Sequence, residues 1–249
     1  MRKHLTDAQV LTLTVAMQRF CDAARRGYIF YFGGVVPAKK ARQLRRKFQA
    51  LYNIDEHRNV RARRRARGEA AAVMIMHELP SQSQIAEEHG EPYVGWLILL
   101  TEGEHAAYWR GENIKIATED DQRLTIGQFQ MLRRTRPGGN SASPSWTWTF
   151  TKSAYRNWRE RVVRSARGDY TESPTQLLME LYRWGSFRGI RSDIGRIVSL
   201  YRREWRKRRR RSDPFPSLPR LRYVQRLRNE FVDFQSKTGS ETHLSGCRT

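Results

Sequence analysis

Cysteine is scarce in this sequence, and the two that occur, Cys21 and Cys247, lie far apart. Two distant cysteines make neither a disulfide framework nor a metal-binding motif. The sequence also lacks an apolar run of about 18 residues, the length needed to span a bilayer. Its N-terminal stretch does not read as a secretory signal, because Asp7 and Gln9 interrupt the apolar residues. We therefore expect a cytoplasmic protein without a membrane partner.

Motifs of the common nucleotide-using and hydrolytic enzymes are absent as well. Gly33 and Gly34 are not followed by Gly-Lys-Ser or Gly-Lys-Thr, so the sequence has no P-loop. It has no glycine-flanked serine elbow and no paired cysteines or histidines at metal-binding spacing. We expect no cofactor and no metal ion, and a binding protein is favoured over an enzyme.

Positive charge is what the chain has in excess. Its 249 residues include 47 Lys and Arg against 25 Asp and Glu, which gives a formal net charge of +22. A compact protein with this charge repels itself unless a polyanion neutralises it, and nucleic acid is the commonest such partner. An acidic membrane surface is the rival polyanion, but nothing else in the sequence indicates membrane binding.

The order of predicted elements indicates an α+β fold. Helices are predicted at 6–25, 38–52 and 152–164, and strands at 28–32, 70–78, 94–101, 128–134 and 145–151. Thr6 would cap the first helix, and the glycine pair after Phe32 would end the first strand. This order is typical of an antiparallel sheet of four or five strands with flanking helices, ferredoxin-like or related. We assign 1–167 to this domain, with a loop at 137–144.

A basic helical module is predicted to follow at 168–235, with a disordered tail at 236–249. Helices are expected at 175–184, from residue 190 to the arginine run, and at 220–234. The long middle helix has an apolar stripe formed by Ile190, Ile194, Ile197, Val198, Tyr201 and Trp205. The first two helices, joined by a glycine-containing turn, could form either a helix-turn-helix or an ordinary helical hairpin.

Lysines and arginines gather in three clusters that predict nucleic-acid contacts. Arginine dominates them, and its planar guanidinium forms paired hydrogen bonds with phosphate and stacks on bases. The predicted contact residues are Lys39, Lys40, Arg42, Arg45 and Arg46; Arg61, Arg63, Arg64, Arg65 and Arg67; and Arg202, Arg203, Trp205, Arg206, Lys207, Arg208, Arg209, Arg210 and Arg211. The third cluster is either the end of a docked helix or an unstructured tail.

Aromatic side chains offer stacking platforms for unpaired bases, but most of them are expected in the core. The residues concerned are Tyr31, Trp109, Trp146, Trp148, Trp158, Trp184 and Trp205. Trp205 is the ambiguous one, because it continues the apolar stripe and also lies among arginines. Both roles are left open for it.

Acidic residues concentrate in one segment of the chain. Between Glu78 and Asp121 there are ten acids and two cations, so this segment has a net charge of −8. The remainder of the chain therefore carries +30. We expect the segment 78–121 to avoid nucleic acid and to form an acidic face that a basic protein partner could cover.

A weak pattern for catalysis consists of His77, Glu78 and Tyr155. In a metal-dependent nicking enzyme, His77 and Glu78 would bind the metal ion and Tyr155 would be the nucleophile. Such enzymes carry two histidines flanking one apolar residue on a strand, and the second histidine is missing here. The competing interpretation is a core histidine with satisfied hydrogen bonds. A metal-independent ribonuclease is a further alternative.

These observations predict a nucleic-acid-binding protein. DNA is favoured over RNA, because the helix pair at 175–211 could read a groove. The composition and layout resemble those of proteins from plasmids and integrated mobile elements that bind DNA for replication or transfer. The main alternative is an RNA-binding or RNA-processing protein, and a DNA-nicking enzyme is the third interpretation.

Overall fold

The chain forms two compact units. The computed structural model describes residues 9–79, 92–135, 144–168, 172–210, 212–221, 226–229 and 231–232. The first unit comprises residues Met1–Ile114 and Leu227–Thr249, and the second comprises Lys115–Arg226. The division at Ile114 comes earlier in the chain than the expected boundary at residue 167. The predicted tail at 236–249 lies outside the described residues, as does all but the last residue of the predicted loop at 137–144.

A mixed sheet forms the centre of the first unit. Its strands within the first unit follow the order β1 (Val10–Leu11), β3 (Ala72–Glu78), β4 (Tyr93–Leu100) and β2 (Phe30–Pro37). The two-residue strand β5 (Lys115–Ile116) begins the second unit. Strand β4 is antiparallel to both β2 and β3, whereas β1 and β3 run parallel. The α+β class is therefore confirmed. The described elements up to β4 follow the order β-α-β-α-α-β-β, which differs from the βαββαβ order of ferredoxin-like domains.

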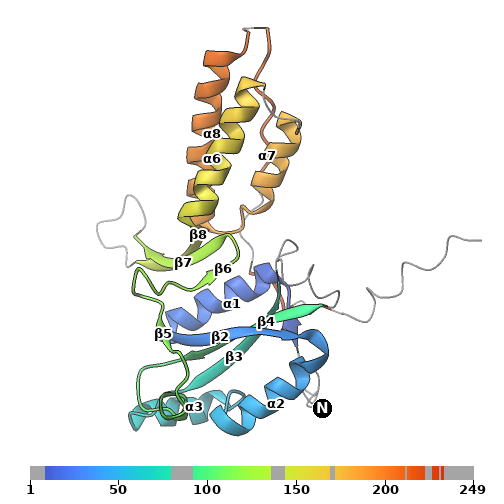
Figure 1. Cartoon of the computed structure of the whole chain (residues 1–249). Helices are drawn as coiled ribbons and strands as arrows, with labels where there is room; N and C mark the ends of the chain where they lie inside the picture. Colours follow the sequence, from blue (N-terminus) through green and yellow to red (C-terminus); the bar gives the residue numbers. More distant parts are fainter. Residues whose placement is uncertain are drawn as a thin grey trace, which may run out of the picture. The chain divides into compact units, whose positions relative to one another are not determined.

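Helices cover both faces of this sheet (Figure 1). Helix α1 (Leu13–Arg25) packs on one face, where Phe20 meets the His77 ring edge-on at 6.0 Å. Helix α2 (Ala41–Tyr52) and the short α5 (Ala106–Trp109) cover the other face, and α2 places Phe48 and Tyr52 in the core. A short 3₁₀ turn, η1 (Ala38–Lys40), leads into α2. The predicted helix at 38–52 is thus confirmed.

Strand β2 is longer than predicted, because it continues through the two glycines that were expected to end it. A Cβ atom on Gly33 would lie 2.3 Å from the carbonyl oxygen of Trp96 on the neighbouring strand. The glycine therefore allows a close approach between β2 and β4 and does not make a turn.

The start of the chain also differs from the prediction of a helix over 6–25. Val10 and Leu11 form a short strand that pairs with Met76 and His77, and α1 begins only at Leu13. The carboxylate of Glu78 accepts a hydrogen bond of 2.8 Å from the Leu13 backbone N–H. This carboxylate therefore does what was expected of Thr6, which lies outside the described residues.

The helix predicted at 220–234 is absent from the described part of that range. Phe231 instead forms an antiparallel bridge with Leu11, and the Val232 N–H donates to the Val10 carbonyl at 2.8 Å. The apolar spacing of this segment suits a helix, but the unpaired edge of β1 offers backbone hydrogen bonds to an extended chain. Tertiary pairing outweighs the local pattern here.

The second unit contains a separate three-stranded antiparallel sheet. Its strands are β6 (Thr125–Ile126), β7 (Phe129–Arg134) and β8 (Ser145–Phe150), in that order. The predicted strands at 128–134 and 145–151 therefore exist, but their assignment to one sheet with the earlier strands was wrong. Both faces of β8 are buried, because α8 (Arg188–Arg208) packs on the threonine side. There the Gly189 N–H donates to Thr147 Oγ1 at 3.0 Å.

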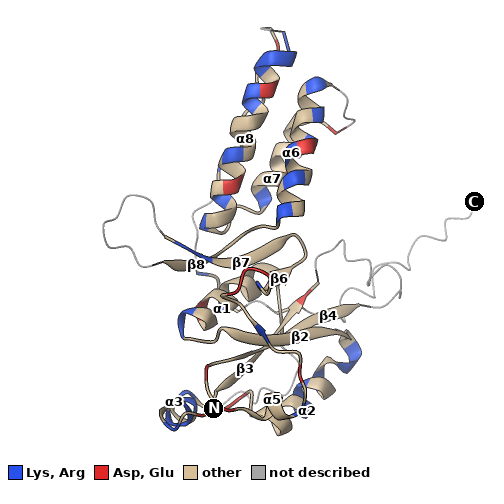
Figure 2. Cartoon of the chain, turned by 60° about the vertical axis from the view of Figure 1, so that its left-hand side comes forward, with Lys and Arg blue, Asp and Glu red and all other residues tan. Residues whose placement is uncertain are grey.

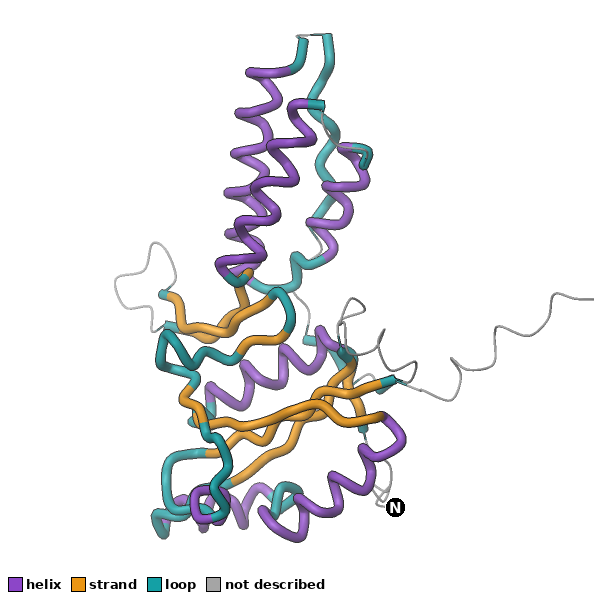
Figure 3. The backbone as a smooth tube through the Cα atoms, in the orientation of Figure 1, coloured by secondary structure: helices purple, strands orange, loops and turns teal. Residues whose placement is uncertain are grey.

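Three helices of the second unit lie alongside one another in Figures 1 and 2, and Figure 3 traces the same bundle as a tube. They are α6 (Lys152–Arg167), α7 (Pro174–Arg183) and α8. A helix-turn-helix would cross its two helices at about 90–120°. Figures 1 and 3 show α7 and α8 aligned along each other without such a crossing, which favours the helical hairpin of the two alternatives.

Candidate nucleic-acid interface

The cations of α8 lie opposite a buried apolar stripe. Ile190, Ile194, Ile197, Val198, Tyr201 and Trp205 are all buried, as their spacing predicted. The exposed cations of the same region are Arg196, Arg202, Arg203, Arg206, Lys207, Arg208 and Arg210. Burial of the stripe fixes the rotation of the helix, so the exposed cations from Arg196 to Lys207 face solvent from a rigid support. Arg208 is in the last turn, beyond the buried part of the stripe, and Arg210 follows the helix. Arg211 lies outside the described residues.

Trp205 is part of the core and does not offer a stacking platform. Only 8% of the residue is exposed. Its ring meets Tyr201 and Phe215 edge-on at 5.7 and 5.8 Å, and its Nε1 donates to the Asp213 carbonyl at 2.9 Å. The structure therefore supports the docked helix over the unstructured tail.

Arg209 differs from its neighbours in the arginine run. Its guanidinium lies 4.9 Å from the centre of the Trp205 ring and donates to the carbonyls of Ala166 and Ser165, each at 3.1 Å. These carbonyls belong to the last turn of α6, where helix geometry leaves acceptors without partners. Arg209 thus joins the ends of α6 and α8, and its contact with nucleic acid stays a prediction beside this structural role.

Helix α6 carries a second row of cations that the sequence-based prediction missed. Lys152, Arg156, Arg159 and Arg167 are exposed and follow one another at spacings of four, three and eight, which places them on one helix face. That spacing is visible in the sequence. The prediction missed the row because it considered only the aromatic and apolar residues, which form the buried face of this helix. The Ser165 and Tyr201 hydroxyls lie 2.7 Å apart, so α6 and α8 are direct neighbours.

The two rows make the second unit much more positive than the first (Figure 2). Residues 115–226 contain 26 Lys and Arg against 10 Asp and Glu, a net charge of +16. The remaining residues contain 21 Lys and Arg against 15 Asp and Glu, a net charge of +6. Most of the excess charge of the chain therefore belongs to the second unit.

In the first unit, the arginine cluster at 61–67 is partly neutralised. It lies on α3 (Arg58–Ala66), a helix that buries no side chain. Arg64 forms ion pairs of 2.9 Å with both Glu56 and Glu69, and Arg67 pairs with Glu69 at 2.8 Å. Arg61 donates to the Glu56 carbonyl, and of the predicted residues here only Arg63 and Arg65 are exposed without such a bond.

The cluster at 39–46 lies on η1 and the outer side of α2. Lys39, Lys40, Arg42 and Arg46 are exposed, whereas Arg45 is half-buried and forms an ion pair with Asp55. The structure therefore places the predicted contact residues in both units, and those of 202–210 belong to the same unit as the additional row on α6.

The residues considered for catalysis have structural surroundings. His77 is buried, and its Nδ1 lies 2.8 Å from the Glu78 carbonyl oxygen, which can only accept a hydrogen bond. Burial lowers the pKa of His77, which keeps the imidazole neutral. Glu78 caps α1, and Tyr155 belongs to the other unit. Among the described residues, no three His, Cys, Asp or Glu side chains gather in a way that could hold a metal ion.

Most of the aromatic residues proposed as stacking platforms are buried, as expected. This holds for Tyr31, Trp146, Trp148 and Trp158. Trp184 is half-buried, and Trp109 on α5 is 81% exposed. Trp109 belongs to the acidic segment 78–121, in which Glu112 accepts a hydrogen bond from the Tyr52 hydroxyl.

No family model, curated protein or solved structure matched this chain. Among the described helices, none combines the length and the apolar character needed to cross a membrane. The distribution of exposed lysine and arginine side chains is therefore the main indication of what the protein binds.

Proposed function

We propose that this protein binds nucleic acid through the cations exposed on α6 and α8. One observation carries this proposal: the net charge of +16 is concentrated in a unit where two neighbouring helices expose rows of lysine and arginine. Few carboxylates accompany these rows. Glu160 is exposed beside the row on α6, and on α8 Glu204 lies 3.6 Å from Arg203 and 3.7 Å from Lys207.

DNA is the expected ligand, and RNA is the alternative. The exposed cations of α8 extend from Arg196 to Arg208, which spans about 18 Å at about 1.5 Å per residue. Duplex DNA presents about one phosphate charge per 1.7 Å of axis, so a rigid row of this length can run beside about five base pairs. These contacts are to the backbone and need no particular base sequence. A role in the replication or transfer of a mobile element is a further prediction from composition.

Binding of the purified protein to matched duplex DNA, single-stranded DNA and RNA, measured by fluorescence anisotropy, tests the proposal. If six to ten phosphates are neutralised, affinity should fall about 10³- to 10⁵-fold between 50 and 200 mM salt. A polyglutamate of similar length serves as a control for general attraction to polyanions. Affinity that does not change with salt, or equal binding of polyglutamate, would contradict the proposal.

A further inference from the structure

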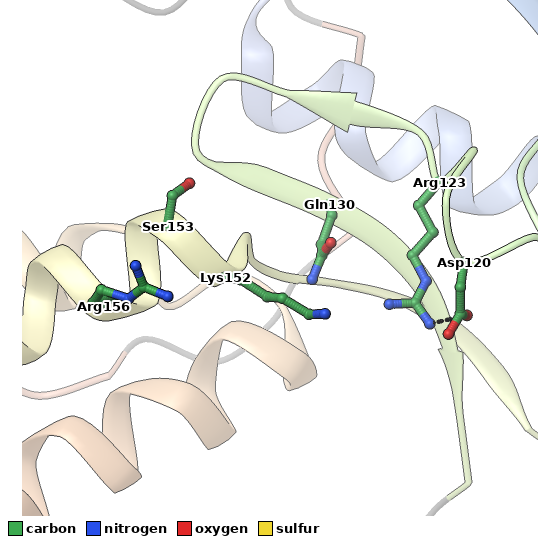
Figure 4. Close-up of a pocket in the computed structure, with 6 residues that line it drawn as sticks. All are labelled: Asp120, Arg123, Gln130, Lys152, Ser153 and Arg156. Carbon is green, nitrogen blue, oxygen red and sulfur yellow. Dashed lines mark hydrogen bonds and ion pairs between the residues drawn. The ribbon is translucent and has the colours of Figure 1, made fainter.

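A polar hollow of about 470 Å³ opens in the second unit beside the first turn of α6 (Figure 4). Three separate parts of the chain line it: the loop before β6, strand β7 and helix α6. The lining side chains are Asp120, Arg123, Gln130, Lys152, Ser153 and Arg156. No aromatic or aliphatic side chain belongs to the lining, so the hollow suits a charged, hydrophilic ligand.

The polar groups of the hollow are only partly engaged with one another. Asp120 accepts a hydrogen bond from the Arg123 guanidinium, which orients it. The Gln130 side chain donates to the Phe150 carbonyl at 3.3 Å. The side chains of Lys152 and Arg156, both on α6, make no hydrogen bond or ion pair with the described part of the chain. Figure 4 shows the polar ends of Lys152, Gln130 and Arg123 turned toward one another.

We infer that this hollow binds a phosphate monoester, and that in the proposed nucleic-acid complex it takes the terminal phosphate of a strand. This inference rests on the proposed function. Three cations and one carboxylate give the lining a net charge of +2. A phosphate monoester carries a charge of about −1.5 to −2 at neutral pH, which matches this value. An internal phosphodiester carries one negative charge and would leave part of the positive charge uncompensated.

The arrangement of the cations also favours the terminal phosphate of a nucleic-acid strand over an internal one. Internal phosphates follow one another along a line, and the exposed row on α6 suits such a line. In the hollow, Lys152 from α6 and Arg123 from the loop before β6 turn toward one space, as single-group recognition requires, and Arg156 lines the side next to Lys152 (Figure 4). Lys152 and Arg156 belong both to the hollow and to the start of the α6 row. A strand that ends in the hollow can therefore continue along Arg159 and Arg167.

Oligonucleotides that differ only in their ends test the inference. Anisotropy titrations would compare a 5′-phosphate, a 3′-phosphate and hydroxyl ends on the same sequence. One phosphorylated form should bind about tenfold more tightly than the hydroxyl form, the effect of one charge-assisted hydrogen bond. Inorganic phosphate should compete more strongly against that form than against the hydroxyl form.

Two matched double variants locate the effect. Lys152→Gln with Arg156→Gln should abolish the preference for the phosphorylated end. Arg159→Gln with Arg167→Gln removes the same charge from the same helix and should keep the preference while weakening all binding. All four side chains are exposed, so both variants should fold, which circular dichroism would verify.

The outcomes separate this inference from the proposed function. Binding without an end preference, or a preference that survives in the Lys152→Gln and Arg156→Gln variant, would overturn the terminal-phosphate site and leave nucleic-acid binding standing. Absence of binding to every oligonucleotide would overturn both.

Discussion

Helices α3 and α8 are both rich in arginine, yet they use this charge differently. In α3 the arginines anchor the helix: Arg64 joins Glu56 and Glu69, and no side chain of the helix is buried. In α8 a continuous apolar stripe anchors the helix, and most arginines are exposed. The comparison teaches that the density of arginine along a sequence does not decide how much charge is available to a ligand. Nearby carboxylates and an independent anchor decide it.

The two anchors differ in strength. An exposed or half-exposed ion pair contributes about 0–1 kcal/mol, because water and salt screen it. Burial of one large apolar side chain contributes about 1.5–3 kcal/mol, and α8 buries several. Helix α8 should therefore hold its cations in place more firmly than α3 does.

Among the changes considered, replacement of Trp205 should weaken the anchoring of α8 most. Trp205→Ala removes a buried ring and a hydrogen bond to Asp213, and the free energy of unfolding should fall by about 3 kcal/mol. Nucleic-acid affinity should fall as well, although no charge is lost, because the end of α8 loses its support. Thermal unfolding and anisotropy of the same sample would measure both. If neither quantity changes, the stripe does not anchor α8 at this position.

His77 should influence stability in the first unit without affecting the interface. Its pKa is lowered by burial, so the unfolded chain binds more protons than the folded chain below about pH 6.5. The stability that the neutral His77 contributes should thus be fully present above this pH, and the free energy of unfolding should fall as the pH drops below it.

Denaturant unfolding at several pH values would show this slope, and His77→Gln should reduce it. Burial also lowers the pKa of His105, so the part of the pH dependence that is due to His105 should remain in the variant. The variant should bind nucleic acid as the native protein does. Metal-dependent DNA cleavage that the native protein performs and His77→Gln or Tyr155→Phe loses would instead support the nicking enzyme.

Adjacent arginines at the end of α8 should give opposite results. Arg209→Gln removes two hydrogen bonds to the end of α6 and a cation–π contact, so stability should fall by about 1 kcal/mol. Arg208→Gln should leave stability unchanged and weaken binding, because the Arg208 side chain is exposed. If both variants change stability and binding equally, Arg209 does not have a structural role that Arg208 lacks.

Local patterns predicted much of the fold. The apolar spacing of α8 and the buried strands β3 and β4 follow directly from the sequence. What failed depended on distant partners: Val10 and Leu11 become a strand only because β3 and Phe231 lie beside them. The separate sheet of β6 to β8 likewise depends on which strands meet in space, which periodicity does not specify.

The candidate interface was predictable in part. The exposed arginines at 202–208 follow from the stripe opposite them, whereas the structural role of Arg209 depends on the end of α6, more than 40 residues earlier. The row of cations on α6 could have been predicted from its spacing in the sequence. The hollow at Arg123 and Lys152 was not, because segments distant in the sequence contribute its cations.

The salt dependence of two charge-matched variants tests the central claim most directly. One replaces Arg206, Arg208 and Arg210 with Gln, and the other replaces Arg58, Arg63 and Arg65, which are equally exposed but belong to the first unit. Both lose three positive charges. If α8 contacts phosphates, the first variant should lower the slope of log affinity against log salt by about 2.7, at about 0.9 per contact, and the second by less than about 1. Equal reductions would show that net charge alone determines binding, which would contradict an interface on the second unit.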